Sequence, residues 1–212
     1  MTTNAPVLDD TEQDAITEIA NLAISRAANA LRQMVAEEVL LSVPIVRVVT
    51  RETAATLVDG NHRNRLVAVQ QTFNGPFSGA ALLIFPEPQS LELVRAIVGR
   101  ERSLQDLVDL EQEALGETGN IILNACLATV ANILHQKMEI SLPSVIRGDG
   151  ETLFRSAASA SENLVLFLYI DFKLRQREIS GFLALLMDLP ALTVFRDLVR
   201  KYVDAIERPA AG

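Results

Sequence analysis

An internal repeat constrains the fold of this chain more than any other feature of the sequence. A spacing of 99 residues relates Glu18 to Glu117 and Asn21 to Asn120. Later in the two copies the spacing changes to 102 and then to 101, as short insertions in loops would cause. A fixed period of this length predicts two homologous units within one domain of 212 residues. The same spacing of 99 residues relates Ser42 to Ser141, Pro44 to Pro143, Glu52 to Glu151 and Thr53 to Thr152.

The two units are expected to span about residues 10–99 and 110–206, followed by a flexible tail over residues 207–212. Asp10 is the expected N-cap of the first long helix, because Gln13 follows it three residues later. Turn residues and apolar periodicity predict three strands after each long helix, with two shorter helices in the first unit and one in the second. The expected helices cover residues 10–38, 52–58, 90–98, 110–136 and 192–206, and the expected strands cover residues 45–50, 65–73, 77–85, 140–146, 163–172 and 179–187.

Three strands per unit predict an α+β fold, in which two homologous α-β repeats share one mainly antiparallel sheet with the long helices packed outside it. A three-stranded unit by itself would have exposed strand edges and a thin core. Joining the strands of both units around a pseudo-twofold axis removes edges. The chain is 49% hydrophobic, which is enough for a substantial core and argues against a disordered or fibrous protein.

Charge and cysteine content narrow the classes of partner. The net charge of -8 would repel a nucleic acid backbone and an anionic lipid surface, so neither is expected as a partner. The single cysteine, Cys126, cannot form an internal disulfide, and the N-terminus has no secretory signal pattern, so a cytoplasmic location is expected. Charged residues interrupt every apolar run before it reaches the roughly 20 residues that cross a bilayer.

No metal site and no cofactor of its own are expected for this chain. His62 lies in a predicted turn and His135 near a helix end, and neither has a second His or Cys at the spacing of metal ligands. The sequence also has no Gly-rich phosphate loop and no Gly-x-Ser-x-Gly nucleophile elbow. The basic residues from His62 to Arg65 are interpreted as a solvated turn.

Each long helix carries a polar stripe around a Glu-x-x-Asn pair. At about 100° per residue, Glu18 and Asn21 share one face of the first helix, and Glu117 and Asn120 share one face of the second. Cys126 lies nine residues after Glu117, on the opposite face of that helix, and is expected to be a core residue. Such a pair is usually part of a solvated face. Here Asn stands in mid-helix in both copies, although it is disfavoured there by roughly 0.5 kcal/mol relative to Ala. The rest of the stripe differs between the copies, with Asp14 at the position of Glu113, Ser25 at that of Asn124, Asn29 at that of Ala128 and Arg32 at that of Ala131.

At these residues the sequence resembles the CheC family of chemotaxis phosphatases, which also includes the single-site CheX and the flagellar-switch protein FliY. The family pattern is an acidic or serine residue, three residues, Glu, two residues and Asn. Residues 14–21 and 113–120 both match this pattern, so the chain resembles CheC more than CheX. The likeness extends to residues 77–86 and covers nearly the whole chain.

The resemblance implies a protein phosphatase that hydrolyses the aspartyl phosphate of a CheY-type response regulator. It implies that Asn21 or Asn120 enters the phosphorylation pocket and orients the attacking water. Glu18 or Glu117 would pair with the active-site lysine of the receiver, and magnesium would be bound by the phosphorylated regulator. Family members can also bind a CheD-type deamidase. The residues expected to contact the partner are Asp14, Ser25, Glu113 and Asn124.

One neighbouring residue distinguishes the two pairs. Gly119 precedes Asn120, as is frequent in the family, whereas Ala20 precedes Asn21. Bulk beside Asn21 is expected to hinder the approach of a partner, so the second pair is favoured as the active one. The alternative to an enzyme is a non-catalytic protein, either an adaptor that binds the response regulator without hydrolysis or a component of the flagellar switch.

Overall fold

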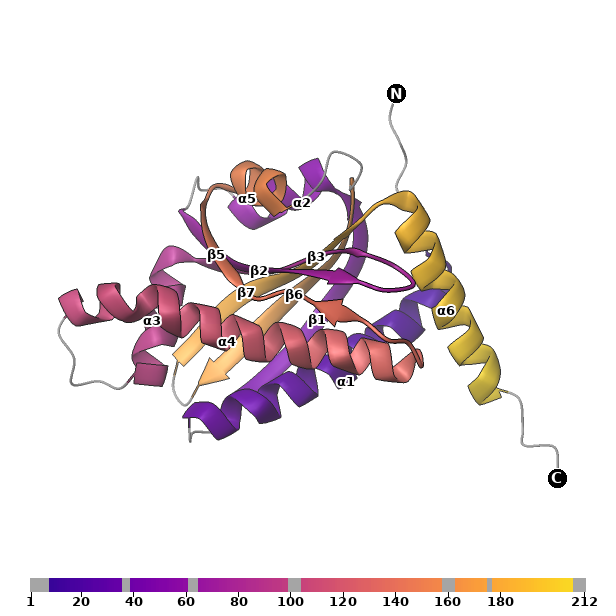
Figure 1. The fold of residues 1–212 in the computed structure, drawn as a ribbon, viewed down its shortest axis with the longest axis horizontal. Helices are drawn as coiled ribbons and strands as arrows, with labels where there is room; N and C mark the ends of the chain where they lie inside the picture. The colour runs from indigo at the N-terminus through magenta and orange to yellow at the C-terminus, as the bar shows by residue number, and fades with distance from the viewer. Residues whose placement is uncertain are drawn as a thin grey trace.

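The computed structural model describes residues 8–35, 39–60, 65–98, 104–157, 163–174 and 177–207 (Figure 1). The helices within these ranges are α1 Asp10–Val35, α2 Arg51–Asp59, α3 Glu87–Val98, α4 Leu104–Ile133, α5 Gly150–Ala157 and α6 Leu189–Glu207. The strands are β1 Val39–Thr50, β2 Leu66–Asn74, β3 Gly79–Pro86, β4 Glu139–Ile140, β5 Ser144–Gly148, β6 Leu164–Leu174 and β7 Arg177–Met187.

The described strands form one sheet in which every neighbouring pair is antiparallel. The strand order is β1-β6-β7-β3-β2-β4, and β5 also pairs with β2. The first strand of each predicted unit therefore pairs with the hairpin of the other unit, β1 with β6 and β5 with β2. The two hairpins meet at the centre, where β3 pairs with β7. The expected α+β fold with a shared, mainly antiparallel sheet is confirmed.

The strand registers follow the spacing of the sequence repeat. Val46 pairs with Leu168 and Val69 pairs with Val145, so a shift of 99 residues converts one pair into the other. At the sheet centre, β3 pairs with β7, and these are the last strands of the two predicted units. Two copies of one unit related by a twofold axis give such a register. The register supports the division of the chain into two units, which stays a prediction.

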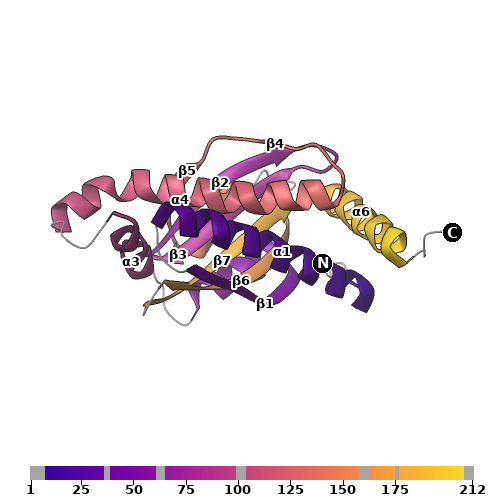
Figure 2. The same ribbon diagram turned by 90° about the horizontal axis from the view of Figure 1, so that it is seen from below.

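Helices cover both faces of the sheet (Figures 1 and 2). α1 and α4 lie side by side on one face, where α3 packs against α4 and α6 packs against α1. α2 and α5 pack against each other on the opposite face. The larger apolar core lies between the long helices and the sheet, and a second core lies beneath α2 and α5. The long helices are thus outside the sheet, as predicted.

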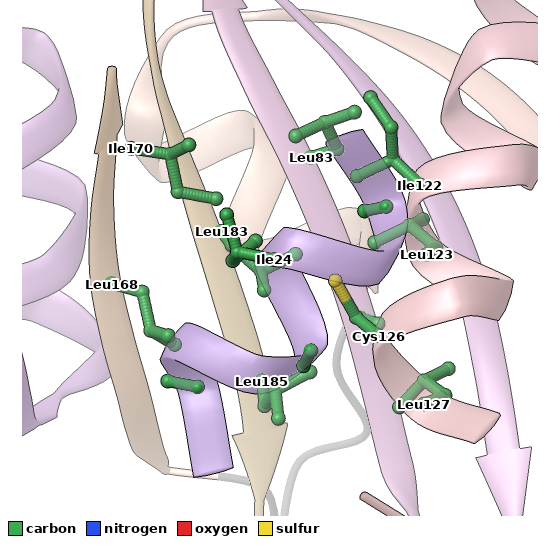
Figure 3. Packing of buried hydrophobic residues seen from close by; sticks show 14 of the residues in the cluster. Ile24, Leu83, Ile122, Leu123, Cys126, Leu127, Leu168, Ile170, Leu183 and Leu185 are labelled. Carbon is green, nitrogen blue, oxygen red and sulfur yellow. The ribbon is translucent and has the colours of Figure 1, made fainter. Parts of the chain in front are cut away.

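The core beneath the long helices contains Cys126 of α4, together with Ile24 of α1 and Leu83 and Leu185 of the sheet (Figure 3). Cys126 is 4% exposed, and burial raises the pKa of its thiol to about 12. The prediction that Cys126 is a core residue is confirmed. The segment Leu110–Ile133 of α4 is long and apolar enough to cross a membrane by length and composition alone, but 56% of its most apolar window is buried inside the protein.

The N-cap of α1 is Asp9 and not Asp10. Asp9 Oδ1 accepts a hydrogen bond from the backbone N–H of Glu12 at 2.8 Å, and Glu12 Oε2 accepts one from the backbone N–H of Asp9 at 3.0 Å. This reciprocal arrangement is a capping box. Gln13, which was expected to complete the box, instead donates a hydrogen bond to the backbone oxygen of Val46 on β1 at 2.7 Å. The prediction was therefore wrong by one residue.

Other boundaries differ where prolines interrupt the strands. β1 begins at Val39 and not at residue 45, and its register shifts between Ser42 and Ile45. β1 lies at the edge of the sheet, where a proline inside a strand is tolerated. The predicted strand 140–146 is two short strands, β4 and β5, with Pro143 between them. At the C-terminal end, Glu207 still belongs to α6, and the rest of the predicted tail lies outside the described residues.

A buried carboxylate joins the start of α1 to α6. Glu12 is 1% exposed and accepts hydrogen bonds from Arg196 at 3.0 and 2.8 Å, and its Oε1 lies 2.8 Å from Nε of Arg200. Burial by itself would raise the pKa of Glu12. The hydrogen bonds from Arg196 and from the Asp9 backbone, together with the charges of both arginines, outweigh burial and hold the pKa below its ordinary value of 4.5.

Glu12→Gln is expected to lower the free energy of unfolding by about 2 kcal/mol near neutral pH, because the two guanidinium groups lose their carboxylate partner. The folded-state pKa lies below 4.5, so the carboxylate stabilises the fold above this pH and loses its effect as the pH falls through the folded-state value. Chemical denaturation at several pH values should show the stabilities of variant and wild type converging in acid. Glu139→Gln, at an exposed carboxylate, is the control and should follow the wild type. A difference that stays constant with pH would contradict this account.

Candidate functional site

Gly119 sets how closely α4 approaches the sheet at the second Glu-x-x-Asn pair. A methyl group at Gly119 would stand 2.5 Å from side-chain carbons of Val69 on β2, so only glycine permits this contact. Asn120 follows directly and is partly buried, whereas Glu117, about one turn earlier, is exposed. The close approach of helix and strand therefore places a carboxamide against the sheet and leaves a carboxylate in solvent.

An open groove between α4 and β5 contains the second pair. The carboxylates of Glu113 and Glu117 are exposed, and neither has a hydrogen-bond or ion-pair partner among the residues that the structure describes. Both charges are therefore available to an incoming partner. The groove is lined by Gln112, Glu113, Gly116, Glu117 and Asn120 of α4 and by Pro143, Ser144 and Val145 at the start of β5.

Two other amide side chains hold the carboxamide of Asn120. Its Oδ1 accepts hydrogen bonds from Nε2 of Gln71 at 3.0 Å and from Nδ2 of Asn124 at 2.7 Å. Gln71 is on β2, is 1% exposed, and also donates to the backbone oxygen of Ser141 at 2.9 Å. The carboxamide at the second site is thus fixed by contacts from a helix and a strand, and the strand residue is held in turn by the backbone of Ser141.

The first pair, on α1, has no such support. Glu18 and Asn21 are exposed, and neither has a hydrogen-bond or ion-pair partner in the described part of the chain. The position equivalent to Gln71 is Ile170, which is fully buried in the apolar core. An apolar side chain there cannot orient a carboxamide. The other predicted residues of this face are also exposed, namely Asp14 and Ser25.

The predicted reason for ranking the two pairs is wrong. Ala20 was expected to hinder the approach of a partner to Asn21, but it is 7% exposed and faces the core. Ala20 and Leu168 are among the residues that line a small apolar cavity of about 30 Å³ between α1, α4 and the sheet. The residue before the asparagine therefore affects the packing of the helix on the sheet and not the access of a partner.

Gln71 was not among the predicted site residues, although the sequence contains a signal for it. Alternate residues of a strand share a face, so Gln71 lies with the buried Val69 and Phe73 on the core side of β2. A glutamine between two core residues, at the position of Ile170 in the other copy, indicates a special role. Asn124, predicted to contact the partner, is partly buried and takes part in the amide network. Its role in binding stays a prediction.

Titratable side chains elsewhere form structural contacts. Within the described ranges, no group of three or more His, Cys, Asp or Glu side chains could hold a metal ion. Glu111 is 5% exposed and accepts hydrogen bonds from Ser90 at 3.1 Å and from Arg147 at 2.7 Å. His135 is exposed at the end of α4 with φ 53°, and His62 lies outside the described residues. The groove of the candidate site is lined by two carboxylates, Glu113 and Glu117, and by the carboxamide of Asn120.

Comparison with known sequences finds one matching family profile and two named relatives. The sequence profile of the family described as chemotaxis phosphatase CheX matches residues 67–167. The flagellar motor switch phosphatase FliY of Bacillus subtilis (strain 168) is 22% identical over 203 residues, which are 93% of this chain and 51% of FliY. The CheY-P phosphatase CheC of the same strain is 22% identical over 143 residues, 65% of this chain and 67% of CheC. The chain thus spans about half the length of Bacillus FliY.

Solved structures show the same fold. The crystal structure of FliY from Thermotoga maritima matches with a TM-score of 0.75 at 19% identity, covering 93% of this chain and 100% of that one. The resemblance to the CheC, CheX and FliY superfamily is confirmed. A chain of the CheX-CheY-BeF3-Mg²⁺ complex from Borrelia burgdorferi matches with a TM-score of 0.50 at 17% identity, covering 78% of this chain and 96% of that one.

The residues that match the CheX profile include all those that form the second site. Residues 67–167 contain the hairpin β2–β3, the helix α4 and the strand β5. Both walls of the groove and the whole amide network of Asn120 therefore lie inside the matched segment. The pair on α1 lies outside it. The part of the chain that matches the CheX profile is thus the part that contains the second site.

Gly119→Ala is expected to destabilise the fold by about 1–3 kcal/mol, because the added methyl group would force α4 away from Val69. Chemical denaturation measures the change. Gly116→Ala is the matched control on the same helix, where the nearest atom to an added methyl group is on Val145 at 3.9 Å. That change should be neutral or stabilising by up to about 1 kcal/mol, since alanine favours a helix. Equal effects of the two substitutions would show that the contact with Val69 does not limit the helix position.

Proposed function

We propose that this chain is an aspartyl-phosphate phosphatase that acts on a CheY-type response regulator, with Glu117 and Asn120 as its main catalytic pair. The observation that carries the proposal is the groove in which an unpaired carboxylate stands about one helical turn from a carboxamide held by Gln71. Both curated relatives are named phosphatases, and one of the matched structures is a complex of CheX with CheY. The names of these proteins support a phosphorylated CheY-type response regulator as the substrate.

The hydrolysis of an aspartyl phosphate requires few catalytic groups. Hydrolysis of an acyl phosphate is favourable by itself, so the catalyst needs mainly to hold a water in line with the phosphorus while existing charges stabilise the transferring group. The neutral carboxamide of Asn120 can hold a water by hydrogen bonding, although it cannot deprotonate it. This role is the one that a water-positioning glutamine has in GTPases. A carboxamide that is already fixed loses little conformational entropy when the complex forms.

The two carboxylates of the groove favour a partner that brings its own positive charge. Glu113 and Glu117 would repel a free phosphate group but attract a lysine beside it. We assign Glu117 the role of pairing with the active-site lysine of the receiver. Magnesium is expected on the phosphorylated regulator, and the matched complex of CheX with CheY contains Mg²⁺ together with BeF3.

The first pair, Glu18 and Asn21, is proposed as a second and weaker site, because its side chains are exposed and no hydrogen bond from the described residues fixes them. Contact of the neighbouring polar residues with the regulator and binding of a CheD-type deamidase remain proposals that rest on the family resemblance. A cytoplasmic location, which was expected from the cysteine content and the N-terminal sequence, also remains a proposal. The neighbouring residues in question are Asp14, Ser25, Glu113 and Asn124.

A non-catalytic role is the second candidate function. The fold matches the whole length of the Thermotoga FliY chain, so an adaptor or a component of the flagellar switch is compatible with the architecture. Such a protein would bind the regulator but would not shorten the lifetime of its phosphate. Binding and hydrolysis therefore have to be measured separately.

Asn120→Ala is expected to lower the rate of phosphate release from the phosphorylated regulator by about a hundredfold, because the water loses its positioning group. Binding of the regulator should stay within about tenfold, since one neutral side chain contributes little to a protein interface. Asn21→Ala should have a smaller effect on the rate. Asn132→Ala is the matched control, because Asn132 is an exposed asparagine on the same helix and is remote from the groove.

The assay uses phosphorylated receivers from the same organism, with phosphate release and regulator binding followed in parallel. A wild-type protein that binds a phosphorylated receiver and does not accelerate its phosphate loss would establish the non-catalytic function. Equal losses of rate in Asn120→Ala and Asn21→Ala would show that the amide network gives the second site no advantage.

A further inference from the structure

We infer that Gln71 is a positioning residue, which orients the carboxamide of Asn120 so that its amino group Nδ2, and not its oxygen, faces the groove. The consequence for catalysis rests on the proposed function. The orientation itself is a property of the fold and can be measured without any substrate. It gives Asn120 a defined chemical role, that of a hydrogen-bond donor.

The hydrogen bonds of Asn120 carry this inference. A carboxamide oxygen has two lone pairs, and those of Asn120 Oδ1 are both used by donors, from Gln71 at 3.0 Å and from Asn124 at 2.7 Å. Only the two N–H groups of Nδ2 remain for a ligand in the groove. Asn120 would therefore donate to the oxygen of the attacking water or to an oxygen of the phosphoryl group.

The orientation of Gln71 is fixed in turn by a group that can only accept. Its Nε2 donates to the backbone oxygen of Ser141 at 2.9 Å, so reversing the glutamine amide would place two oxygens against each other. Ser141 is held on β2 by two hydrogen bonds with the backbone of Thr72, each 2.9 Å long. The position of Ser141 beside β2 therefore sets the orientation of the Gln71 amide, and Gln71 sets the orientation of the Asn120 carboxamide.

The buried amide oxygen of Gln71 lowers the stability of the fold. Its Oε1 is buried and has no hydrogen-bond partner in the described part of the protein. A buried amide oxygen without a hydrogen-bond partner destabilises the folded state, because it has lost its hydrogen bonds to water. At the equivalent position the other copy has Ile170, which is fully buried among apolar side chains. A destabilising polar residue at a core position is expected where function requires it.

Gln71→Ile introduces the side chain that the chain itself has at residue 170. We expect a melting temperature equal to or above that of the wild type, a kcat for phosphate release lower by about ten- to a hundredfold, and a KM for the phosphorylated receiver within about twofold. A purely structural residue would give the opposite, a lower melting temperature with unchanged kcat, and would overturn the inference. If Gln71→Ile does not fold, Gln71→Met, which keeps the length of the side chain without a donor, takes its place.

Gln71→Glu tests the direction of the hydrogen bond. The introduced carboxylate can only accept, so it would repel Asn120 Oδ1 and turn the carboxamide over. When the introduced carboxyl is protonated, it can donate a hydrogen bond to Asn120. The ratio of the variant's kcat to that of the wild type should therefore rise as the pH falls through the pKa of this carboxyl. Because the site is buried, that pKa is expected above the ordinary value of about 4.3. The control is Gln70→Glu on the opposite face of β2, whose relative kcat should not change with pH. A pH-independent ratio for Gln71→Glu would overturn the inference.

Side-chain amide signals in an NMR spectrum of the protein alone separate this inference from the proposed function. The Nε2 protons of Gln71 should exchange with solvent more slowly than the Nδ2 protons of Asn120, and Asn120→Ala should shift the Gln71 signal. Equal exchange of both amides would overturn the orientation even if the chain is a phosphatase. Slow exchange at Gln71 in a chain without phosphatase activity would leave the orientation standing and refute the proposed function.

Discussion

The exchange of first strands between the two predicted units is the constraint on which the rest of the structure depends. β1 completes the sheet beside β6, and β5 completes it beside β2, so neither unit builds its part of the sheet from its own strands alone. The second site is consequently composite. Gln71 comes from the first unit, whereas Asn120 and Ser141 come from the second. A change in the pairing of β5 with β2 would separate the residues that orient the carboxamide.

Close packing of α4 on β2 makes the short hydrogen bonds of this site possible. Gly119 faces Val69, and the next residue along the helix is Asn120, which therefore comes within 3.0 Å of Gln71, two residues along the strand from Val69. A bulkier residue at 119 would move the helix outward along with its carboxamide. The short distance between the backbones of α4 and β2, which Gly119 permits, therefore determines that the side chains of Asn120 and Gln71 can form a hydrogen bond.

Much of this arrangement could be predicted from the sequence, because it follows from local patterns. The spacing between Glu18 and Glu117 predicted the repeat, and helical periodicity separated the polar stripes from core residues such as Cys126. The exchange of strands could not be predicted, since a strand has the same alternating pattern whichever hairpin it joins. The role of Ala20 was misjudged for a related reason, because the neighbour of a small residue on a helix depends on tertiary packing. Gln71 was overlooked because it is one polar residue among the apolar side chains on the core side of β2.

The two copies have kept their structural anchors and have diverged at the support of the site. Glu12 and Glu111 are related by the 99-residue spacing, and both are buried carboxylates that bind arginine near the start of the motif helices. Gln71 and Ile170 are related by the same spacing, but one is an amide with an unpaired oxygen and the other is part of the apolar core. A duplicated scaffold can carry one destabilising site more easily than two, because the second copy contributes stability without it. The asymmetry between the two Glu-x-x-Asn pairs therefore arises in the sheet beneath the helices, while the Glu and Asn residues themselves are the same in both predicted units.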